Sequence, residues 1–394
     1  MQSILHGCFL PLRLLQWEKL NHWKWFKYPQ KDGKKENAMK TALLIPIYEP
    51  GDRVLPFLKN FKPDDFDYFL VVDDGSGPYY QAIFEAIREQ TPFEVIGYSV
   101  NKGKGGALKT GFKHILDKDD SFDLIMSADS DGQHRYEDIL ATKAKAEQHP
   151  NSLTLGVRDF SGSSVPFKSR LGNRFSSLYY FLTSGKKLGD TQTGLRAIPK
   201  CLYPLALDTR GTRFEYEMNF LLEACHNCPV ETNSIETIYE PEGEPRQTHF
   251  RPFVDSVRVY RTPLLYVLFA LLSAVLDISL FHVLSSFIFI EDPAIQVFIS
   301  ALIARVSSGI FNFFTLHFIV FSSKSGLGRS ALKYLALFSV NYLFSSTLTY
   351  IFRFLPIHLT PLKVIIDIFV MVANYFLNLG WVFTRHRIKK GVKQ

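Results

Sequence analysis

From Lys40 onward, short apolar runs alternate with longer stretches in which apolar residues recur every three or four positions. The short runs predict buried β-strands and the longer stretches predict amphipathic helices. The expected strands cover residues 42–47, 68–72, 93–98, 124–127 and 153–157. The expected helices cover residues 54–61, 80–89, 107–116 and 136–148. Alternation of this kind is typical of βαβ units, so the pattern predicts an α/β domain with a mostly parallel sheet.

The pattern changes after Arg261, where four long apolar stretches follow one another. They cover about residues 264–290, 294–321, 331–355 and 362–383, and each is long enough to cross a bilayer as a helix. Basic residues gather before the first stretch, between the second and third, and after the fourth: Arg258, Arg261, Lys324, Arg329, Lys333, Arg385, Arg387, Lys389 and Lys390. By the positive-inside rule, this distribution predicts a multi-pass membrane protein with the α/β domain and both termini in the cytoplasm.

The chain therefore divides into three parts. The α/β domain covers residues 39–261, and an all-α membrane domain of four helices covers residues 262–394. Residues 1–38 form an N-terminal extension that matches neither pattern. Its tryptophans alternate with lysines, which leaves open whether it lies at a lipid headgroup layer or is dispensable.

The second and fourth apolar stretches end alike, in NFFTLHFIVF (residues 312–321) and NYFLNLGWVF (residues 374–383). Position 312 thus corresponds to position 374, and this correspondence indicates two duplicated helical hairpins. Asp277, Arg305 and Asp367 lie inside the apolar stretches. Ionisable residues inside a membrane are costly, so these three are functional candidates, with a structural ion pair as the equal alternative.

Polar residues follow each expected strand, and the carboxyl ends of parallel strands meet at one edge of a sheet. Asp129, Asp131 and Gln133 follow the fourth strand at alternating positions. Their oxygens suit a Mg²⁺ or Mn²⁺ ion that carries phosphate groups. An isolated acidic pair of this kind is more often an ordinary turn, so the assignment depends on the polar residues that lie beside it.

Two further strand ends favour a nucleotide site at the same edge. Asp73 and Asp74 follow the second strand, where a carboxylate can accept hydrogen bonds from the edge of a pyrimidine or guanine base. Residues 101–106 form a glycine-rich turn before a helix, and Lys104 in that turn can meet a phosphate group. The spacing is not that of a Walker A loop, so this turn alone is weak support.

Composition narrows the choice of partner. The chain of 394 residues has a net charge of +7 and a pI near 9.0. Its basic residues form no continuous patch interleaved with aromatic residues, which argues against nucleic acid. Many of them flank the apolar stretches instead, which fits an anionic membrane surface. The four cysteines form no disulfide framework, and Cys225 with Cys228 lacks the second pair of a closed zinc site.

Five motifs, IPIYEP, VVDDGS, NKGKGGALKTG, ADSDGQH and DTQTGLRAIP, occur in this order. Together they resemble the family 2 glycosyltransferases, which have the Rossmann-like α/β fold called GT-A, and among these the polyprenyl-phosphate sugar synthases. The resemblance covers about residues 39–261. It implies an inverting enzyme that moves a sugar from a UDP- or GDP-linked nucleotide sugar to undecaprenyl or dolichyl phosphate, for the assembly of cell-surface glycans or glycoproteins.

The resemblance also implies a role for each motif. The nucleoside would be contacted by Pro46, Tyr48, Glu49, Asp73 and Asp74, and the divalent metal on the diphosphate would be held by Asp129, Asp131 and Gln133. The diphosphate itself would meet Lys104, Arg246 and His249. The acceptor phosphate would be clamped by Arg158, Arg170 and Arg174, in a site completed by Asn173, Thr193, Gly194 and Arg196. The expected catalytic residues among these are Asp131, Arg158 and Arg170.

The acceptor side carries two further expectations. Residues 175–182 predict an amphipathic helix at the membrane interface, with an ordinary core helix as the alternative. A phosphate monoester has a second pKa of about 6 and is largely ionised at neutral pH, so transfer to it needs no general base. Glu215 and Glu217 would matter only if the acceptor were a hydroxyl, and are otherwise expected to be structural.

The four apolar stretches and NYFLNLGWVF resemble the GtrA-like family, small membrane proteins thought to help move lipid-linked sugars across the bilayer. Two other functions stay open at this point. The enzyme could glycosylate a non-lipid polysaccharide, or the chain could be a lipid-sugar transporter whose first domain only binds a nucleotide sugar. Association into a homo-oligomer also stays open.

Overall fold

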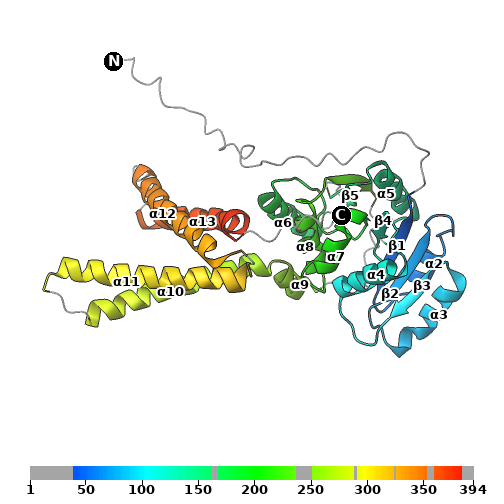
Figure 1. Cartoon of the computed structure of the whole chain (residues 1–394), viewed down its shortest axis with the longest axis horizontal. Helices are drawn as coiled ribbons and strands as arrows, with labels where there is room; N and C mark the ends of the chain where they lie inside the picture. Colours follow the sequence, from blue (N-terminus) through cyan, green and yellow to red (C-terminus); the bar gives the residue numbers. More distant parts are fainter. Residues whose placement is uncertain are drawn as a thin grey trace, which may run out of the picture. The chain divides into compact units, whose positions relative to one another are not determined.

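The computed structural model describes residues 39–132, 134–160, 165, 167–236, 251–287, 291–323, 325–352 and 359–383. Within these residues, a seven-stranded sheet with its helices precedes a series of long helices, as Figure 1 shows. The N-terminal extension lies outside the described residues. The order of an α/β part followed by an all-helical part agrees with the sequence pattern.

All five expected strands are present, and the sheet contains two more. The strands are β1 (Thr41–Ile47), β2 (Tyr68–Asp73), β3 (Glu94–Gly97), β4 (Leu124–Ser127), β5 (Leu153–Arg158), β6 (Arg196–Pro199) and β7 (Val230–Ile235). Their order in the sheet is β3-β2-β1-β4-β6-β5-β7. Only β6 pairs antiparallel, with β4 on one side and β5 on the other, so the predicted mostly parallel sheet is confirmed.

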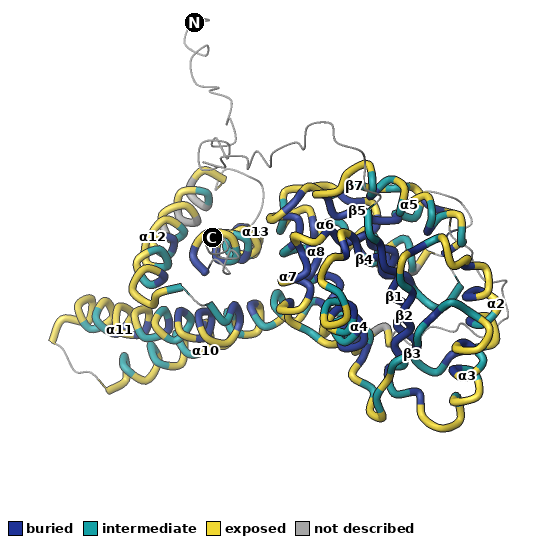
Figure 2. Tube along the Cα trace, turned by 45° about the vertical axis from the view of Figure 1, so that its right-hand side comes forward, coloured by how far each residue is buried: buried dark blue, intermediate teal, exposed yellow. Residues whose placement is uncertain are grey.

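Helices cover both faces of the sheet. The helices of this part of the chain are α2 (Val54–Leu58), η1 (Pro78–Tyr80), α3 (Gln81–Gln90), α4 (Lys104–Lys118), α5 (Tyr136–Gln148), α6 (Phe167–Ser184), η2 (Lys200–Leu202), α7 (Tyr203–Asp208), α8 (Glu215–Ala224) and α9 (Pro252–Val259). The central strand β1 is buried along its whole length, and Figure 2 shows it with β2 and β4 in the buried interior. Leu44 packs with α4, α7 and α8, whereas Leu43 and Ile45 pack with α2, α3 and α5. Alternating side chains of one strand thus build two separate cores.

Where the structure describes the C-terminal part, it contains four long helices: α10 (Arg261–Phe287), α11 (Pro293–Phe314), α12 (Leu327–Phe352) and α13 (Leu359–Leu377). Among the described residues, three helical stretches are long and apolar enough to cross a membrane: Arg261–Phe287, Pro293–Val320 and Ile365–Val382. The helix α12 is long but less apolar, so its crossing of the membrane stays a prediction.

The two copies of the repeated segment adopt the same unusual conformation. After α11 the chain winds into a π-helix, η3 (Thr315–Val320), and after α13 into a second one, η4 (Asn378–Val382). Since π-helices are rare, their occurrence at matching positions supports the duplication that the repeated segments indicate.

Candidate active site

The polar strand ends meet at one edge of the sheet, as the sequence predicts. Asp73 ends β2 and pairs in register with Ile47 of β1 and Gly97 of β3. Asp129 follows β4 by two residues, and Arg158 ends β5. In a parallel sheet, this edge is where ligands bind. The sheet therefore brings the expected nucleotide, metal and acceptor residues to one side of the domain.

The residues expected to contact the nucleoside lie at the ends of β1 and β2 and in the loops that follow them. Ser76 joins them, because its backbone N–H donates to Asp73 Oδ1 at 2.9 Å and its hydroxyl accepts from the Glu49 backbone N–H at 2.9 Å. Glu49 has a φ of 47°, an uncommon conformation for a non-glycine residue that turns the chain at the strand end. A hydrogen bond to Glu49, and then partial burial, raise the pKa of Tyr48. Pro46 lies buried within β1.

Asp74 organises the glycine-rich turn. Its Oδ1 accepts hydrogen bonds from the Tyr98 hydroxyl at 2.5 Å and from the backbone N–H groups of Lys102 at 2.9 Å and Gly103 at 3.2 Å. Its Oδ2 accepts from Asn101 Nδ2 at 3.1 Å. Asp74 is buried, and both of its oxygens are used by the chain itself. Its adjacent position to Asp73 suggests a shared role, but the structure gives the two carboxylates different surroundings. A nucleoside contact of Asp74 stays a prediction.

Asp129 lies against the backbone of the DTQTG segment. A Cβ atom built on Gly194 would lie 2.2 and 2.3 Å from its two carboxylate oxygens, so only glycine allows this approach. The Ser127 hydroxyl donates to the Gly194 carbonyl at 3.1 Å, and Ser127 pairs with Arg196 in the β4–β6 register. The antiparallel strand β6 therefore fixes the position of Asp129.

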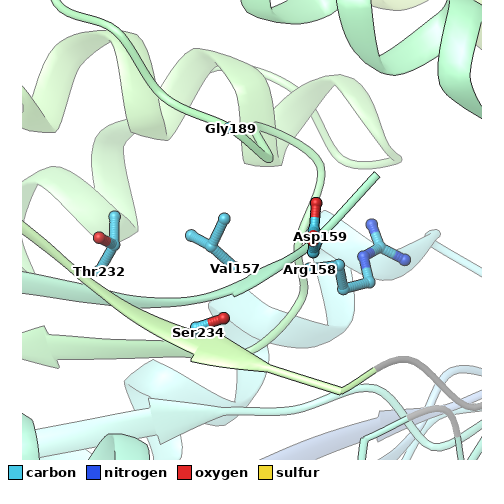
Figure 3. Close-up of a pocket in the computed structure, with 6 residues that line it drawn as sticks. All are labelled: Val157, Arg158, Asp159, Gly189, Thr232 and Ser234. Carbon is cyan, nitrogen blue, oxygen red and sulfur yellow. The ribbon is translucent and has the colours of Figure 1, made fainter. Parts of the chain in front are cut away.

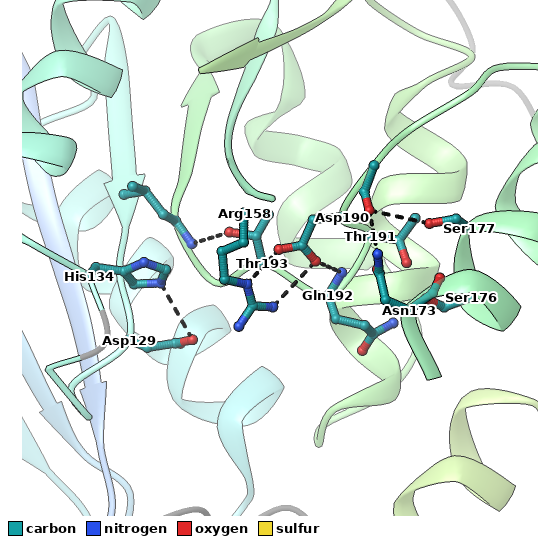
Figure 4. A network of polar contacts seen from close by, with 12 residues as sticks. Asp129, His134, Arg158, Asn173, Ser176, Ser177, Asp190, Thr191, Gln192 and Thr193 are labelled. Carbon is teal, nitrogen blue, oxygen red and sulfur yellow. Dashed lines mark hydrogen bonds and ion pairs between the residues drawn. The ribbon is translucent and has the colours of Figure 1, made fainter. Parts of the chain in front are cut away.

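Asp129 has two basic neighbours. Lys104 Nζ, from the first residue of α4, lies 2.5 Å from Asp129 Oδ1 and 2.9 Å from Glu217 Oε1. His134 Nε2 lies 3.8 Å from Asp129 Oδ2, as Figure 4 shows. Burial by itself would raise the pKa of Asp129, but Lys104 and His134 hold it well below its usual range. Burial would lower the pKa of Lys104, yet the two carboxylates raise it above its usual range. Asp129 and Lys104 are therefore both charged at neutral pH.

Arg158 is fixed by a bidentate ion pair. Its Nε donates to Asp190 Oδ2 at 2.6 Å and its Nη2 to Asp190 Oδ1 at 3.3 Å, and Figure 4 shows this pair beside Asp129. Burial would lower the pKa of Arg158, but Asp190, Asp129 and Asp131 raise it. Arg158 also lines a pocket of about 270 Å³ at the ends of β5 and β7, with Val157, Asp159, Gly189, Thr232 and Ser234 (Figure 3).

The predicted acceptor residues fall into two groups. Arg170, Asn173 and Arg174 lie on α6, where Arg170 Nη2 donates to the Val165 carbonyl at 3.3 Å and Asn173 Nδ2 to the Gly189 carbonyl at 2.6 Å. Arg196 is buried instead, and donates to the backbone carbonyls of Thr193, Glu217 and Thr191 at 2.9, 2.8 and 3.5 Å. Thr193 is buried too, and its hydroxyl accepts from the Leu195 N–H at 3.2 Å. Arg196 and Thr193 therefore support the backbone of the site from its buried side.

Sequence reasoning missed two members of the site. Glu217, expected to be structural, contacts Lys104, and His134, given no role, approaches Asp129. His134 belongs to the ADSDGQH motif, which was a usable signal. Glu217 lies far from Lys104 along the chain, and no spacing rule connects them. Gln133, Arg246 and His249 lie outside the described residues.

The residues near Asp129 fit a divalent metal that arrives with its substrate. Among the described residues, no three His, Cys, Asp or Glu side chains are grouped as a complete metal site. Mg²⁺ typically binds through one or two carboxylates together with substrate phosphates, and Asp129 and Asp131 supply that number. The half-buried, ionised carboxylate of Asp129, balanced by Lys104, is a hard oxygen donor of the expected kind.

Comparison with known proteins identifies both domains. Residues 43–200 match the model of the glycosyl transferase family 2, and residues 265–383 match that of the GtrA/DPMS transmembrane domain. The chain therefore contains a glycosyl transferase family 2 domain followed by a GtrA/DPMS transmembrane domain. Both predicted resemblances are thereby confirmed, as are the α/β GT-A-type fold followed by membrane helices and the assignment as an enzyme.

Several relatives of this glycosyltransferase have assigned activities. UDP-N-acetylglucosamine–dolichyl-phosphate N-acetylglucosaminyltransferase of Methanococcus voltae is 27% identical over 227 residues, 52% of this chain and 89% of that protein. Dolichyl-phosphate beta-glucosyltransferase of Saccharomyces cerevisiae is 30% identical over 110 residues, 25% of this chain and 31% of that one. A solved structure of glucosyl-3-phosphoglycerate synthase from Mycobacterium tuberculosis, with Mn²⁺, UDP-glucose and phosphoglyceric acid, is 15% identical with a TM-score of 0.42, covering 58% of this chain and 78% of that chain.

Proposed function

We propose that this enzyme transfers a sugar from a nucleotide sugar to a polyprenyl phosphate at the cytoplasmic surface of a membrane. The observation that carries the proposal is the composition of α6. This helix holds Arg170, Asn173 and Arg174, and it also exposes large apolar side chains: Phe167 (74%), Leu171 (56%), Phe175 (57%) and Leu178 (53%). A lipid phosphate needs cations beside an apolar surface, whereas a water-soluble acceptor does not.

The short helix α9, just before the first membrane helix, has the same character. It exposes Phe253 (81%), Val254 (40%) and Val257 (40%). Exposed apolar faces of this size usually mark contact with a membrane or a partner. Together with the apolar helices that follow, α6 and α9 support a catalytic domain that lies against the lipid surface. The relatives named for dolichyl-phosphate transfer support the same acceptor class.

The donor side supplies charge stabilisation. Asp129 and Asp131 are the proposed holders of Mg²⁺ or Mn²⁺, and a divalent ion there would neutralise the charge that develops on the leaving diphosphate. Lys104, which contacts Asp129, and Arg158, which pairs with Asp190, bring cationic groups beside it. Asp73 and the loop of Tyr48 and Glu49 are the proposed nucleoside contacts.

The acceptor side supplies alignment. The acceptor phosphate is already ionised near neutral pH, so Arg170 and Arg174 need only orient it for an inverting in-line attack on the sugar. Arg side chains suit this task because the guanidinium group binds phosphate oxygens in pairs. Residues Arg246 and His249 are proposed to close over the donor diphosphate.

A second function is supported for the membrane domain, namely passage of the lipid-linked sugar across the bilayer. Arg305 Nη2 lies 3.2 Å from Asp277 Oδ2, between α10 and α11, and the Ser308 hydroxyl donates to Asp277 Oδ1 at 3.1 Å. The Arg305 side chain is 61% exposed, in a helix that has no other charged residue. Ionisable groups kept inside a membrane commonly mark a path for a polar headgroup.

The acceptor is tested with membranes that contain the full-length protein. They are incubated with labelled UDP- and GDP-sugars and then extracted with organic solvent. Label is expected in the lipid fraction, in a bond cleaved by mild acid, and absent with EDTA or with Asp131→Asn, which removes one anionic metal ligand. Label in a water-soluble polymer, or released as free sugar at the same rate without lipid phosphate, would disprove the polyprenyl acceptor.

A further inference from the structure

Lys104 lies at a helix position where a positive charge is unfavourable. It is the first residue of α4, where the helix dipole disfavours a cation. Its ammonium group is instead held between two carboxylates, 2.5 Å from Asp129 Oδ1 and 2.9 Å from Glu217 Oε1. The Lys104 and Glu217 side chains are 17% and 4% exposed. This largely covered cation at the helix start therefore stabilises the two carboxylates and not the helix.

The start of α4 is held firmly against the segment that begins α8. The Gly106 N–H donates to the Thr212 carbonyl at 2.7 Å, and a Cβ atom on Gly105 would lie 2.4 Å from Tyr216 Cβ. This close approach sets the distance between Lys104 and Glu217. Since Glu217 lies in the first turn of α8, the dipole of that helix stabilises its charge.

The charges are not balanced. With His134 counted as neutral, Lys104 with Asp129 and Glu217 has a net charge of −1, and Asp131 adds a second negative charge, while Arg158 and Asp190 neutralise each other. A divalent cation would balance the total. Such a cation must, however, share Asp129 with the ammonium group that already contacts Oδ1.

Glu217 has its own requirement for a cationic partner. An ionised carboxylate that is 4% exposed is costly without a partner, so the ammonium group keeps its contact with Glu217 when it gives up Asp129. From that position, Lys104 can donate to a diphosphate bound beside Asp129.

We propose that Lys104, anchored by Glu217, is a built-in counter-ion that competes with the divalent metal for Asp129 and passes to the donor diphosphate when the metal binds. Glu217 is then a positioning residue that acts through Lys104. The proposal rests on the metal-assisted donor site proposed above and is independent of the acceptor.

Mn²⁺ binding to the detergent-solubilised full-length protein tests this directly, with free Mn²⁺ measured by electron paramagnetic resonance. Lys104→Met removes the competing charge and should tighten Mn²⁺ binding by about tenfold, as expected for one charge a few ångströms away. In Glu217→Gln, Lys104 loses its second carboxylate partner and pairs with Asp129 alone. Mn²⁺ binding should therefore weaken by about tenfold. Lys109→Met, which removes a lysine of α4 that lies over the Tyr216 ring, is the matched control and should leave Mn²⁺ binding unchanged.

Calorimetric titration with UDP and GDP at saturating Mn²⁺ completes the test. The nucleoside diphosphate that binds best to wild type should bind less tightly to Lys104→Met, although this variant binds Mn²⁺ more tightly than wild type does. If Lys104→Met does not fold, Lys104→Arg carries the test, because a guanidinium group pairs more strongly with Asp129 and should weaken Mn²⁺ binding. Equal or weaker Mn²⁺ binding by folded Lys104→Met, or unchanged binding by Glu217→Gln or Lys104→Arg, would overturn the proposal. So would the absence of Mn²⁺ binding in every variant, whereas lipid labelling in the same preparations reports separately on the proposed function.

Discussion

Replacing Gly194 by alanine should disable the donor site through Asp129 while the sheet stays folded. The new Cβ atom would lie 2.2 and 2.3 Å from the two Asp129 oxygens, far inside an ordinary contact of 3.4–4 Å. The carboxylate must therefore retreat by about 1 Å, or β6 must shift against β4. Because β4 and β6 are paired in register, we expect the side chain to move first.

The expected effects on rate and stability differ in size. Overpacking of one methyl group costs about 1–3 kcal/mol, and about 2–4 °C of melting temperature is lost per kcal/mol in a domain of this size. A misplacement of about 1 Å at a site that depends on alignment can cost about a hundredfold in rate. We therefore expect Gly194→Ala to lower kcat by about a hundredfold and the melting temperature by only a few degrees.

The assay measures label transferred to lipid at saturating donor and acceptor, with melting followed by tryptophan fluorescence. Gly172→Ala is the control, because nothing lies within 4 Å of a Cβ atom on Gly172. It adds the same methyl group to α6 and should leave turnover unchanged, while the better helix propensity of alanine raises the melting temperature slightly. Wild-type turnover and Mn²⁺ affinity in Gly194→Ala would refute the contact between residue 194 and Asp129. Equal losses of turnover in both variants would refute the site-specific explanation.

Three further predictions address other parts of the protein. Hydrogen bonds from Lys118, Tyr68 and His114 lower the pKa of Glu94 to about 2, against the effect of burial. The stabilisation that Glu94 gives the fold is therefore complete above the ordinary pKa of 4.5 and is lost as the pH falls towards 2. Chemical unfolding should show Glu94→Gln to be less stable than wild type at pH 7 and equally stable near pH 2. Arg170→Ala should raise KM for polyprenyl phosphate about tenfold or more and KM for the donor far less, since a hydrogen bond to a charged group is worth about 1.5–3 kcal/mol; equal effects on both would move Arg170 to the donor side. Asp277→Asn should spare lipid-sugar synthesis but slow the appearance of product in the outer leaflet of sealed vesicles, as counted with a membrane-impermeant oxidant; unchanged outward accumulation would leave Asp277 structural.

The strands that are easiest to predict from sequence are those that are buried on both faces. β1, β2 and β4 are continuous apolar runs because both of their faces are covered by helices. β6 is only four residues long and includes Arg196, whose charge conceals the strand. Arg196 fits there because its guanidinium group donates to three backbone carbonyls, a tertiary arrangement that no local pattern contains.

The donor site shows the same limit at the level of single side chains. The positions of Asp73 and Asp129 follow from strand ends alone, since parallel topology brings these ends together. The different surroundings of Asp74 depend on the turn at Gly75, where φ is 76°, and on donors from Tyr98 and the segment after it. Residue type and spacing identify where a carboxylate lies along the chain, but tertiary contacts decide whether it faces a ligand or the chain.

In the membrane domain, comparison of the two repeated segments distinguishes the residues that pack the helices from the ionisable residues. The two copies share the residues that pack their ends, since Phe313 and Tyr375 are equivalent, as are Phe321 and Phe383, and all four lie in one buried cluster. The same alignment of the two copies pairs Arg305 with Asp367, so the ionisable position carries opposite charge in the two copies. The equivalent positions are thus aromatic in both copies where the ends pack, whereas the ionisable position differs between them. A purely structural anchor has no need of that divergence, which is why the Asp277–Arg305 pair is the first place to test for a function beyond anchoring.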